Sequence, residues 1–251
     1  MVGMTLIAII MSVSLTSCSK DDPDGGDFTN EKKLVKIENT EGFYVLFRYD
    51  DKGRLIRAAE YDLGTLYEYS FIWGDGTIKF RDVTATIKNG LVYSEDSEQI
   101  KDYNICRYNQ FNRLIKYEKE DQSIIHNLLW DGDKLISVTE TMSSDYGSTS
   151  DITFTYEKTC KKGFNPDWVN MVGVGSSDWL YCAHPELLGL RTKQLPKSAT
   201  RNMTYNDTGY KSSHTAHFSY EFDKDGYISK ITIIETYEGE TSTDTYLLTW
   251  E

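Results

Sequence analysis

The chain has 251 residues and a net charge of -12, so we do not expect a basic surface that binds nucleic acid or an anionic membrane. Its 18 tyrosines against only 4 prolines favour β-strands over helices or disorder. The length is ample for one sizeable core, and all-β domains of this size often fold as one unit.

The first 17 residues are an apolar stretch that ends in Leu15-Thr16-Ser17, directly before Cys18. This pattern resembles a bacterial lipoprotein signal, in which the cysteine is lipidated and becomes the mature N-terminus. The stretch holds no Lys or Arg, which leaves room for a start further upstream. It is also shorter than the ~20 residues that a membrane span needs. We therefore expect a signal peptide over 1–17 and an outer-membrane lipid anchor at Cys18.

Residues 18–32 contain the anchor cysteine and an acidic run, Asp21-Asp22-Pro23-Asp24. The run has no apolar periodicity, which is typical of a flexible tether with a reach of roughly 20 Å. An acidic run after the cysteine also resembles the export signal that sends Bacteroidetes lipoproteins to the cell surface. The plain alternative is a solvated charge run. We expect the protein to face the cell exterior, although the sequence leaves a periplasmic orientation open.

One element recurs along the rest of the chain. Residues 49–55 read Tyr-Asp-Asp-Lys-Gly-Arg-Leu: an aromatic residue closes one strand, turn residues follow, and an apolar residue opens the next. Asp and Asn bond their own backbone in such turns, and Gly53 and Gly226 stand where we expect a positive φ. Looser copies occupy residues 73–76, 108–112, 130–133, 205–209 and 222–226. The sequence therefore predicts a series of β-hairpins.

A second set of looser turns alternates with these copies, at residues 62–64, 88–90, 119–121, 145–147 and 238–240. The alternation places the two sets at opposite ends of one sheet. The spacing predicts an all-β, antiparallel up-and-down meander of about 14 strands over residues 33–251. A meander of this length curls strongly, and closing into a barrel removes its edges.

A helical insert over residues 163–199 interrupts the meander. Asn165 as N-cap, followed by Pro166, predicts a helix that ends at Gly173. Asp178 opens a possible second turn of helix, residues 185–189 a third, and strands resume near residue 199. The insert is too short for a core of its own, so we expect it to close one end of the barrel.

The hairpins, the insert and its tail, Leu188-Gly189-Leu190 with Leu195-Pro196-Lys197-Ser198, resemble one Bacteroidetes lipoprotein family. That family is catalogued as a domain of unknown function with a porin-like fold, and the similarity covers residues 33–251. The resemblance implies a porin-like barrel and a lipid-anchored location, with no established catalytic residues to carry over. Residues 49–55 also resemble the YD repeat of Rhs-type shells, but irregular spacing argues against a true Rhs array.

Residues that carry chemistry are few. The histidines His214 and His217 point to opposite faces of a strand, and residues 221–226 lack the ligands of a calcium loop, so we expect neither a metal nor another cofactor. Cys160 and Cys182 bracket part of the insert and form a possible disulfide. The alternative is that the cysteines are small buried apolar residues. Trp168 and Trp179 are candidate ligand-stacking residues, although strand aromatics are more often core.

These observations favour a non-enzymatic cell-surface lipoprotein whose barrel binds a ligand, with a glycan or a surface protein as the expected partner. Two alternatives remain. One is a hydrolase that uses acidic residues near the insert, since paired carboxylates are the minimum for that chemistry. The other is an outer-membrane pore. Strand residues such as Arg57 and Lys116 suit water better than the lipid-facing band of a pore.

Overall fold

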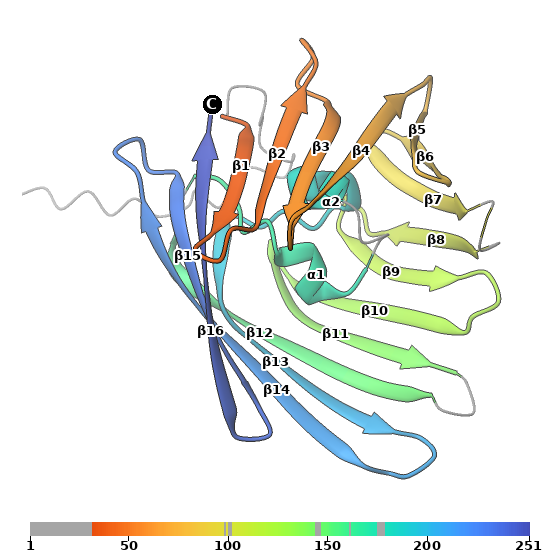
Figure 1. Cartoon of the computed structure of the whole chain (residues 1–251). Helices are drawn as coiled ribbons and strands as arrows, with labels where there is room; N and C mark the ends of the chain where they lie inside the picture. Colours follow the sequence, from red (N-terminus) through yellow and green to blue (C-terminus); the bar gives the residue numbers. More distant parts are fainter. Residues whose placement is uncertain (1–31, 98, 100–101, 144–146, 161, 175–178) are drawn as a thin grey trace, which may run out of the picture.

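The computed structural model describes residues 32–97, 99, 102–143, 147–160, 162–174 and 179–251. The signal peptide, Cys18 and the tether lie outside these residues. The described strands form one closed antiparallel barrel in sequence order, in which β1 pairs with β16 (Figure 1). The predicted all-β meander closed into a barrel is therefore confirmed.

The described residues contain 16 strands, against an expected count of about 14. The turns absent from the predicted sets follow residues 39, 80 and 97 and carry no aromatic-Asp pattern, which is why the sequence pattern undercounts the strands. The strands are β1 (Leu34–Asn39), β2 (Tyr44–Tyr49), β3 (Leu55–Asp62), β4 (Thr65–Trp73), β5 (Thr77–Phe80), β6 (Val83–Lys88), β7 (Leu91–Ser97), β8 (Asp102–Tyr108), β9 (Leu114–Lys119), β10 (Ile124–Asp131), β11 (Lys134–Met142), β12 (Ser148–Cys160), β13 (Gln194–Tyr205), β14 (Lys211–Phe222), β15 (Ile228–Tyr237) and β16 (Glu240–Trp250).

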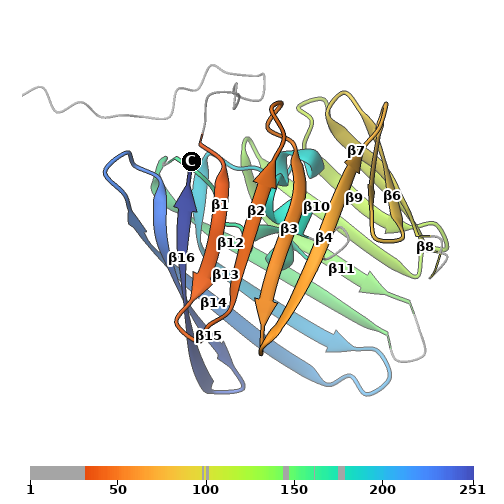
Figure 2. The same ribbon diagram turned by 45° about the horizontal axis from the view of Figure 1, so that its top comes forward.

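The barrel has two different ends. Both termini of the described chain meet at one of them, where the Glu251 N–H donates to the Lys33 carbonyl at 2.9 Å. We call this the closed end because the insert also lies there, and we call the opposite rim the open end (Figures 1 and 2). Strands β12 to β16 are the longest, so the wall that they form is the taller side of the barrel.

The predicted assignment of turns to ends is wrong at two places. The turn at residues 206–210 lies at the open end, because the insert takes the preceding closed-end position and successive turns of a meander alternate. The turn at 88–90 lies at the closed end, because the short β5–β6 hairpin adds one unforeseen reversal. The expected positive φ is confirmed at Gly53 (73°) and Gly226 (86°).

Aromatic residues fasten most of the hairpins at the closed end, and four of them belong to copies of the repeated motif: Tyr49, Trp73, Tyr108 and Trp130. In the described residues, seven of the eight hairpins that turn at the open end carry such a bond, from an aromatic near the end of the second strand to a carbonyl near the start of the first. These bonds, which we call aromatic clasps, are Tyr49 to Leu34, Trp73 to Leu55, Tyr108 to Val92, Trp130 to Leu114, Tyr156 to Leu135, Tyr220 to Pro196 and Trp250 to Ile228.

The clasps compensate for strand pairing that is disrupted beside the closed-end turns. Many closed-end hairpins shift register beside the turn, as at Arg48/Tyr49 and Leu129/Trp130, and a bulge of this kind disrupts the ladder locally. A buried carbonyl without a partner costs free energy, and the Tyr O–H or Trp N–H from the next strand of the chain supplies that partner. In the β5–β6 hairpin, Ile87 holds the equivalent place and has no polar group to donate.

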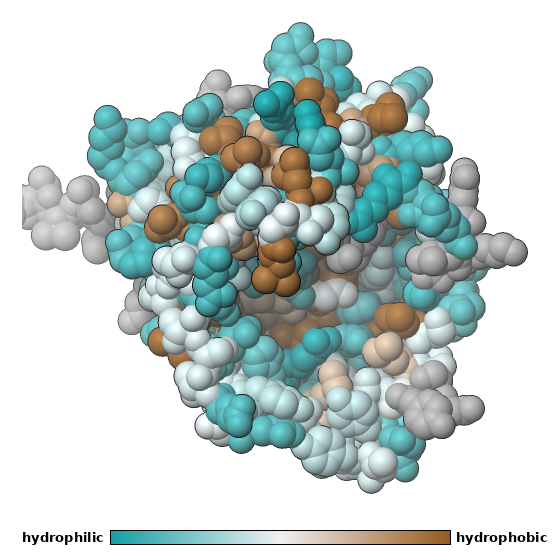
Figure 3. All heavy atoms as spheres, viewed as in Figure 1, coloured by the Kyte–Doolittle hydropathy of each residue, from teal (hydrophilic) through white to brown (hydrophobic). Residues whose placement is uncertain are grey.

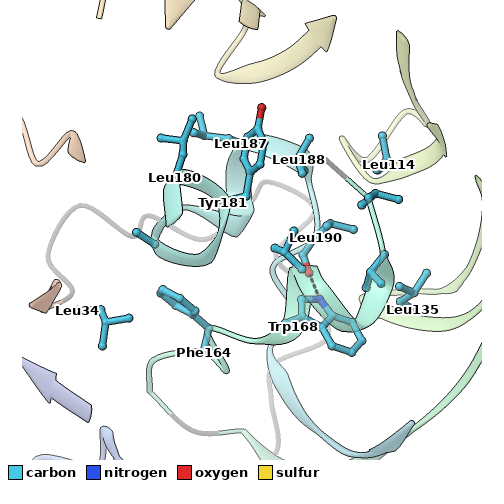
Figure 4. Close-up of a cluster of buried hydrophobic side chains, with 14 of the residues drawn as sticks. Leu34, Leu114, Leu135, Phe164, Trp168, Leu180, Tyr181, Leu187, Leu188 and Leu190 are labelled. Atoms are coloured by element: carbon cyan, nitrogen blue, oxygen red, sulfur yellow. Dashed lines mark hydrogen bonds between the residues drawn. The ribbon is translucent and has the colours of Figure 1, made fainter. Parts of the chain in front are cut away.

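The insert enters the barrel from the closed end and contains α1 (Trp168–Val172), α2 (Trp179–Ala183) and the 3-10 helix η2 (Pro185–Leu188). Its buried side chains join those of the wall in one core, in which Trp168, Leu188 and Leu190 of the insert lie near Leu114 and Leu135 of the wall (Figure 4). The described helices lack the length and apolarity of a membrane-crossing helix.

Polar contacts fix α2 and η2 to the wall. The Trp179 indole N–H donates to Glu60 of β3 at 2.9 Å, and the Tyr181 hydroxyl donates to Glu95 of β7, which also accepts from Tyr117. The Leu55 N–H donates to His184 Nε2 at 3.2 Å. These contacts fit the expectation that the insert closes one end of the barrel.

The details of the insert differ from the prediction. Strand β12 continues to Cys160 and β13 begins at Gln194, so the insert is shorter than residues 163–199. Pro196 is tolerated in a strand because the register shifts there. Asp167 and not Asn165 is the N-cap of α1, since the Asn165 side chain accepts the Asp167 N–H in a turn before the helix. Gly173 ends α1 at a φ of 75°, as predicted.

Candidate functional site

The open half of the barrel holds a cavity on its taller wall. The cavity has a volume of about 270 Å³ and is lined by Arg201, Met203 and Tyr205 of β13, Ser212 and His214 of β14, and Tyr237 of β15. Figure 3 shows the molecule hollowed below the insert, with hydrophilic side chains around the hollow. Because the insert fills the closed end, this cavity is reached from the open end.

A polar cluster lies on the barrel wall beside the cavity. His126, Glu140 and Ser150 stand opposite one another on β10, β11 and β12, and Arg201 follows on β13. The Arg201 guanidinium donates to Glu140, and His126 Nε2 lies 3.7 Å from the same carboxylate oxygen. Burial lowers the pKa of His126, which favours the neutral imidazole. We call these residues the lumen cluster.

The lumen cluster also touches the insert. A Cβ placed at Gly173, the C-cap of α1, would lie 3.8 Å from His126 Nε2 and 3.9 Å from both Arg201 and Glu140. The end of α1 therefore covers one side of the cluster, and Arg201 links the other side to the cavity.

Three atoms of the lumen cluster have no hydrogen-bond partner among the described residues: His126 Nδ1, Ser150 Oγ and Arg201 Nε. His126 is 4% exposed and Ser150 is 0% exposed, so the protein shields these atoms from bulk water. A buried polar atom without a partner costs about 1–3 kcal/mol. Buried groups in this state are explained by an ordered water or ion, by local strain or by a chemical role.

Carboxylates on β15 and β16 face the start of α1. Burial, together with the charges of Glu235 and Asp244, raises the pKa of Asp167 to about 6, while the Asn170 amide opposes the shift by donating to Asp167 at 2.9 Å. His214 Nε2 lies 3.6 Å from Glu235, which connects these carboxylates to the cavity. The site therefore combines a carboxyl group of raised pKa with two further carboxyl groups, those of Glu235 and Asp244.

Asp167→Asn is expected to stabilise the protein at pH 7.5 by about 1–3 kcal/mol and to leave stability unchanged near pH 4. The pKa of Asp167 is about 6 in the folded chain against an ordinary 3.8, so the folded state holds the extra proton between those values. Stability of the natural protein then falls as pH rises from about 4 to about 6. Asparagine keeps the bond with Asn170 and has no proton to lose. Urea unfolding of both proteins between pH 4 and 8 checks the expectation, and parallel curves would contradict it.

The two tryptophans predicted to bind ligand both have protein partners. Trp168 is 3% exposed, packs edge-on against Phe154 at 4.8 Å and donates to the Leu190 carbonyl at 2.8 Å. Trp179 is half-buried against Phe43 and Phe47. Neither lines the cavity described above. A role in ligand binding stays a prediction for both residues.

The part of the chain that the structure describes holds no group of three or more His, Cys, Asp or Glu residues that could hold a metal ion. Cys106 and Cys182 are buried, and burial raises the pKa of the Cys106 thiol. The side chain of Cys160 lies outside the described residues, so its pairing with Cys182 stays a prediction.

Sequence reasoning missed Arg201 and considered His214 only as a metal ligand, a role that it rejected. The signal that could have found them is strand alternation. Ala216 and Phe218 mark the inward face of β14, and His214 shares that face at the open end. Arg201 stands directly opposite His214 on β13. Polar residues on an inward face are informative because that face normally holds apolar side chains.

Comparison with known proteins identifies the fold. No family model matches the sequence, and no curated protein matches it either. Among solved structures, a porin-like protein from Bacteroides vulgatus ATCC 8482 aligns with a TM-score of 0.61 at 14% identity, covering 87% of this chain and 99% of that one. A porin-like protein from Bacteroides uniformis ATCC 8492 aligns with a TM-score of 0.56 at 12% identity, covering 89% and 98%. This chain shares their porin-like barrel fold.

Proposed function

We propose that the protein is a non-enzymatic, lipid-anchored cell-surface protein that binds a ligand in the open half of its barrel. The observation that carries this proposal is the asymmetry of the barrel: the insert fills one end, and a cavity with both polar and aromatic lining residues opens towards the other. The porin-like fold is typical of an outer-membrane or surface protein.

The position of the first described residues supports an orientation. Lys33 and Glu251 pair at the closed end, so the tether leaves the barrel there. With Cys18 lipidated, a tether with a reach of roughly 20 Å holds the closed end near the membrane. The open end and its cavity then face away from the membrane, where a ligand reaches them.

The outer wall supports a barrel that stands in water. Ion pairs join Arg57 to Glu68, Arg107 to Glu118, and Lys230 to Glu221. Glu68 lies between the exposed Leu66 and Ile72 on the same face of β4, which interrupts an apolar band. A lipid-facing Lys or Arg costs about 2–4 kcal/mol at the membrane midplane. The pore alternative must also remove the insert from the closed end.

The hydrolase alternative has one specific observation in its favour. A carboxyl group with a raised pKa beside ionised carboxylates is the arrangement that acid–base hydrolysis uses, and Asp167 with Glu235 and Asp244 provides it at the start of the insert. If this alternative holds, Asp167→Asn abolishes hydrolysis of a bound ligand and leaves its affinity unchanged. Under the non-enzymatic proposal, no ligand is turned over by either protein.

Cys18→Ala is expected to abolish acylation and to release the folded barrel as soluble protein. Metabolic labelling with a fatty acid and washing of membranes without detergent measure the two effects. Cysteines introduced in the Cys18-containing protein test the orientation: Thr208→Cys at the open end should react faster with a bulky maleimide on intact cells than Lys52→Cys at the closed end. A Cys18→Ala protein that stays embedded in washed membranes would support the pore instead.

A further inference from the structure

The cavity has two kinds of wall. Tyr205 and Tyr237 provide aromatic surface, and Met203 adds an apolar side chain. Tyr237 is 47% exposed and packs edge-on against His214 with ring centroids 6.3 Å apart, which leaves its ring accessible. Arg201, Ser212 and His214 supply the polar side. A ligand that fits this cavity therefore presents an apolar face on one side and hydrogen-bonding groups on the other.

The hydrogen-bonding needs of the polar side are mixed. The guanidinium of Arg201, whose side chain is 36% exposed and lines the cavity, requires acceptors, because it donates hydrogen bonds and has no lone pair to offer. The carboxylate of Glu235 beside His214 requires donors. A hydroxyl group both donates and accepts, so a ligand with several adjacent hydroxyls meets both needs at once.

The charges around the cavity argue against an anionic ligand. Arg201 is the cation among the cavity-lining residues other than histidine, and Glu140 already pairs with it. Glu235 adds a second carboxylate near the cavity. A ligand carboxylate or phosphate would have to compete with Glu140 for Arg201 and would be repelled by Glu235. A neutral ligand meets neither penalty.

From these three observations we propose that the cavity binds a neutral sugar ring, with its C–H face on Tyr237 or Tyr205 and its hydroxyls on Arg201, Ser212 and His214. This proposal rests on the proposed function and names its ligand class. The volume of about 270 Å³ lies just below the usual range for ligand pockets, about 300–1,000 Å³, which suits a ligand no larger than one ring. The open end lets the rest of a longer glycan extend into solvent.

Calorimetric titration of the purified mature barrel with defined probes tests the proposal. The probes are three neutral disaccharides (maltose, cellobiose and lactose), with glucuronate as an anion and spermidine as a cation. We expect at least one disaccharide to bind with a higher affinity than either glucuronate or spermidine. Tyr237→Ala should weaken that binding about tenfold, and Tyr237→Phe should preserve it, since stacking uses the ring and not the hydroxyl.

Matched variants separate binding from folding. Phe111→Ala removes an exposed aromatic side chain at the closed end, far from the cavity, and should leave affinity unchanged. Arg201→Gln should weaken binding even where a thermal melt shows the barrel still folded. Binding of spermidine or glucuronate alone, binding that Tyr237→Ala does not change, or no binding of any disaccharide would each overturn the proposal.

One further variant distinguishes this failure from failure of the proposed function. Ser212→Cys places a thiol in the cavity wall, and a small thiol reagent should modify it in the folded protein. Rapid modification of the thiol without sugar binding would refute the proposal that the ligand is a sugar, and it would still support a cavity that is open to small molecules. Absence of modification would refute the accessible cavity on which both proposals depend.

Discussion

Gly189→Ala is expected to lower the free energy of unfolding by about 2–4 kcal/mol and to loosen the insert within the barrel. Gly189 has a φ of 62°, which alone costs a side-chain-bearing residue about 1 kcal/mol. A Cβ at this position would also lie 2.2 Å from the backbone oxygen of Asn112, in the closed-end turn between β8 and β9. Overpacking of this kind costs about 1–3 kcal/mol more, because neither backbone segment can move alone.

Gly209→Ala is the matched control. Gly209 has a similar φ of 66°, and nothing lies within 4 Å of the position where its Cβ would stand. Its loss should therefore be limited to the φ term, and the difference between the two variants measures the contact of η2 with the wall. Urea unfolding followed by circular dichroism gives both values. Equal losses would show that the insert does not press against the β8–β9 turn.

Much of the barrel could be predicted because short stretches of sequence determine its turns and helix ends. A turn such as that at residues 49–55 specifies its own geometry through Asp50, which accepts hydrogen bonds from the Lys52 and Arg54 N–H groups, and through Gly53. The start of η2 at Pro185 and the ends of the helices at Gly173 and Gly189 follow from equally local rules. Hairpins that form in sequence order leave few topologies to choose between.

The aromatic clasps could not be predicted in the same way. The motif shows that an aromatic residue precedes the turn, and it does not show that Trp130 donates to a carbonyl at the start of β9. That contact depends on the register of two neighbouring strands and on the bulge between Leu129 and Trp130. The motif combines two roles: Asp and Gly form the turn, and the aromatic residue joins its own strand to the preceding strand.

The candidate site was the part of the structure that could be predicted least well from the sequence. Arg201, His214 and Tyr237 lie on three strands, and their meeting depends on pairing across β13, β14 and β15. Trp168 and Trp179 drew attention because aromatic residues in a helical insert look available to a ligand. Which side of a short helix is covered depends on what surrounds it, and here the buried side chains of the insert pack with those of the barrel wall in one core.

Trp168→Ala is expected to have the largest effect on stability, with a loss of about 3–5 kcal/mol. The indole ring is 3% exposed and lies between α1 and β12, where it contacts Phe154 and Tyr156. Alanine would leave a cavity in the core and would remove the N–H that the Leu190 carbonyl accepts at 2.8 Å. Trp168→Phe keeps a ring and loses only this bond, so its expected loss is about 1–3 kcal/mol.

The same pair of variants tests whether the insert and the barrel unfold together. If the core is continuous, Trp168→Ala should lower the protection of amides in α1 and in β12 by the same free energy in hydrogen exchange. Trp179→Ala, at a half-buried position on α2, should have a smaller effect on both segments. Faster exchange in α1 with unchanged exchange in β12 would mean that the insert opens as a separate unit. The closed end would then be a gate, and the insert would no longer argue against passage through the barrel.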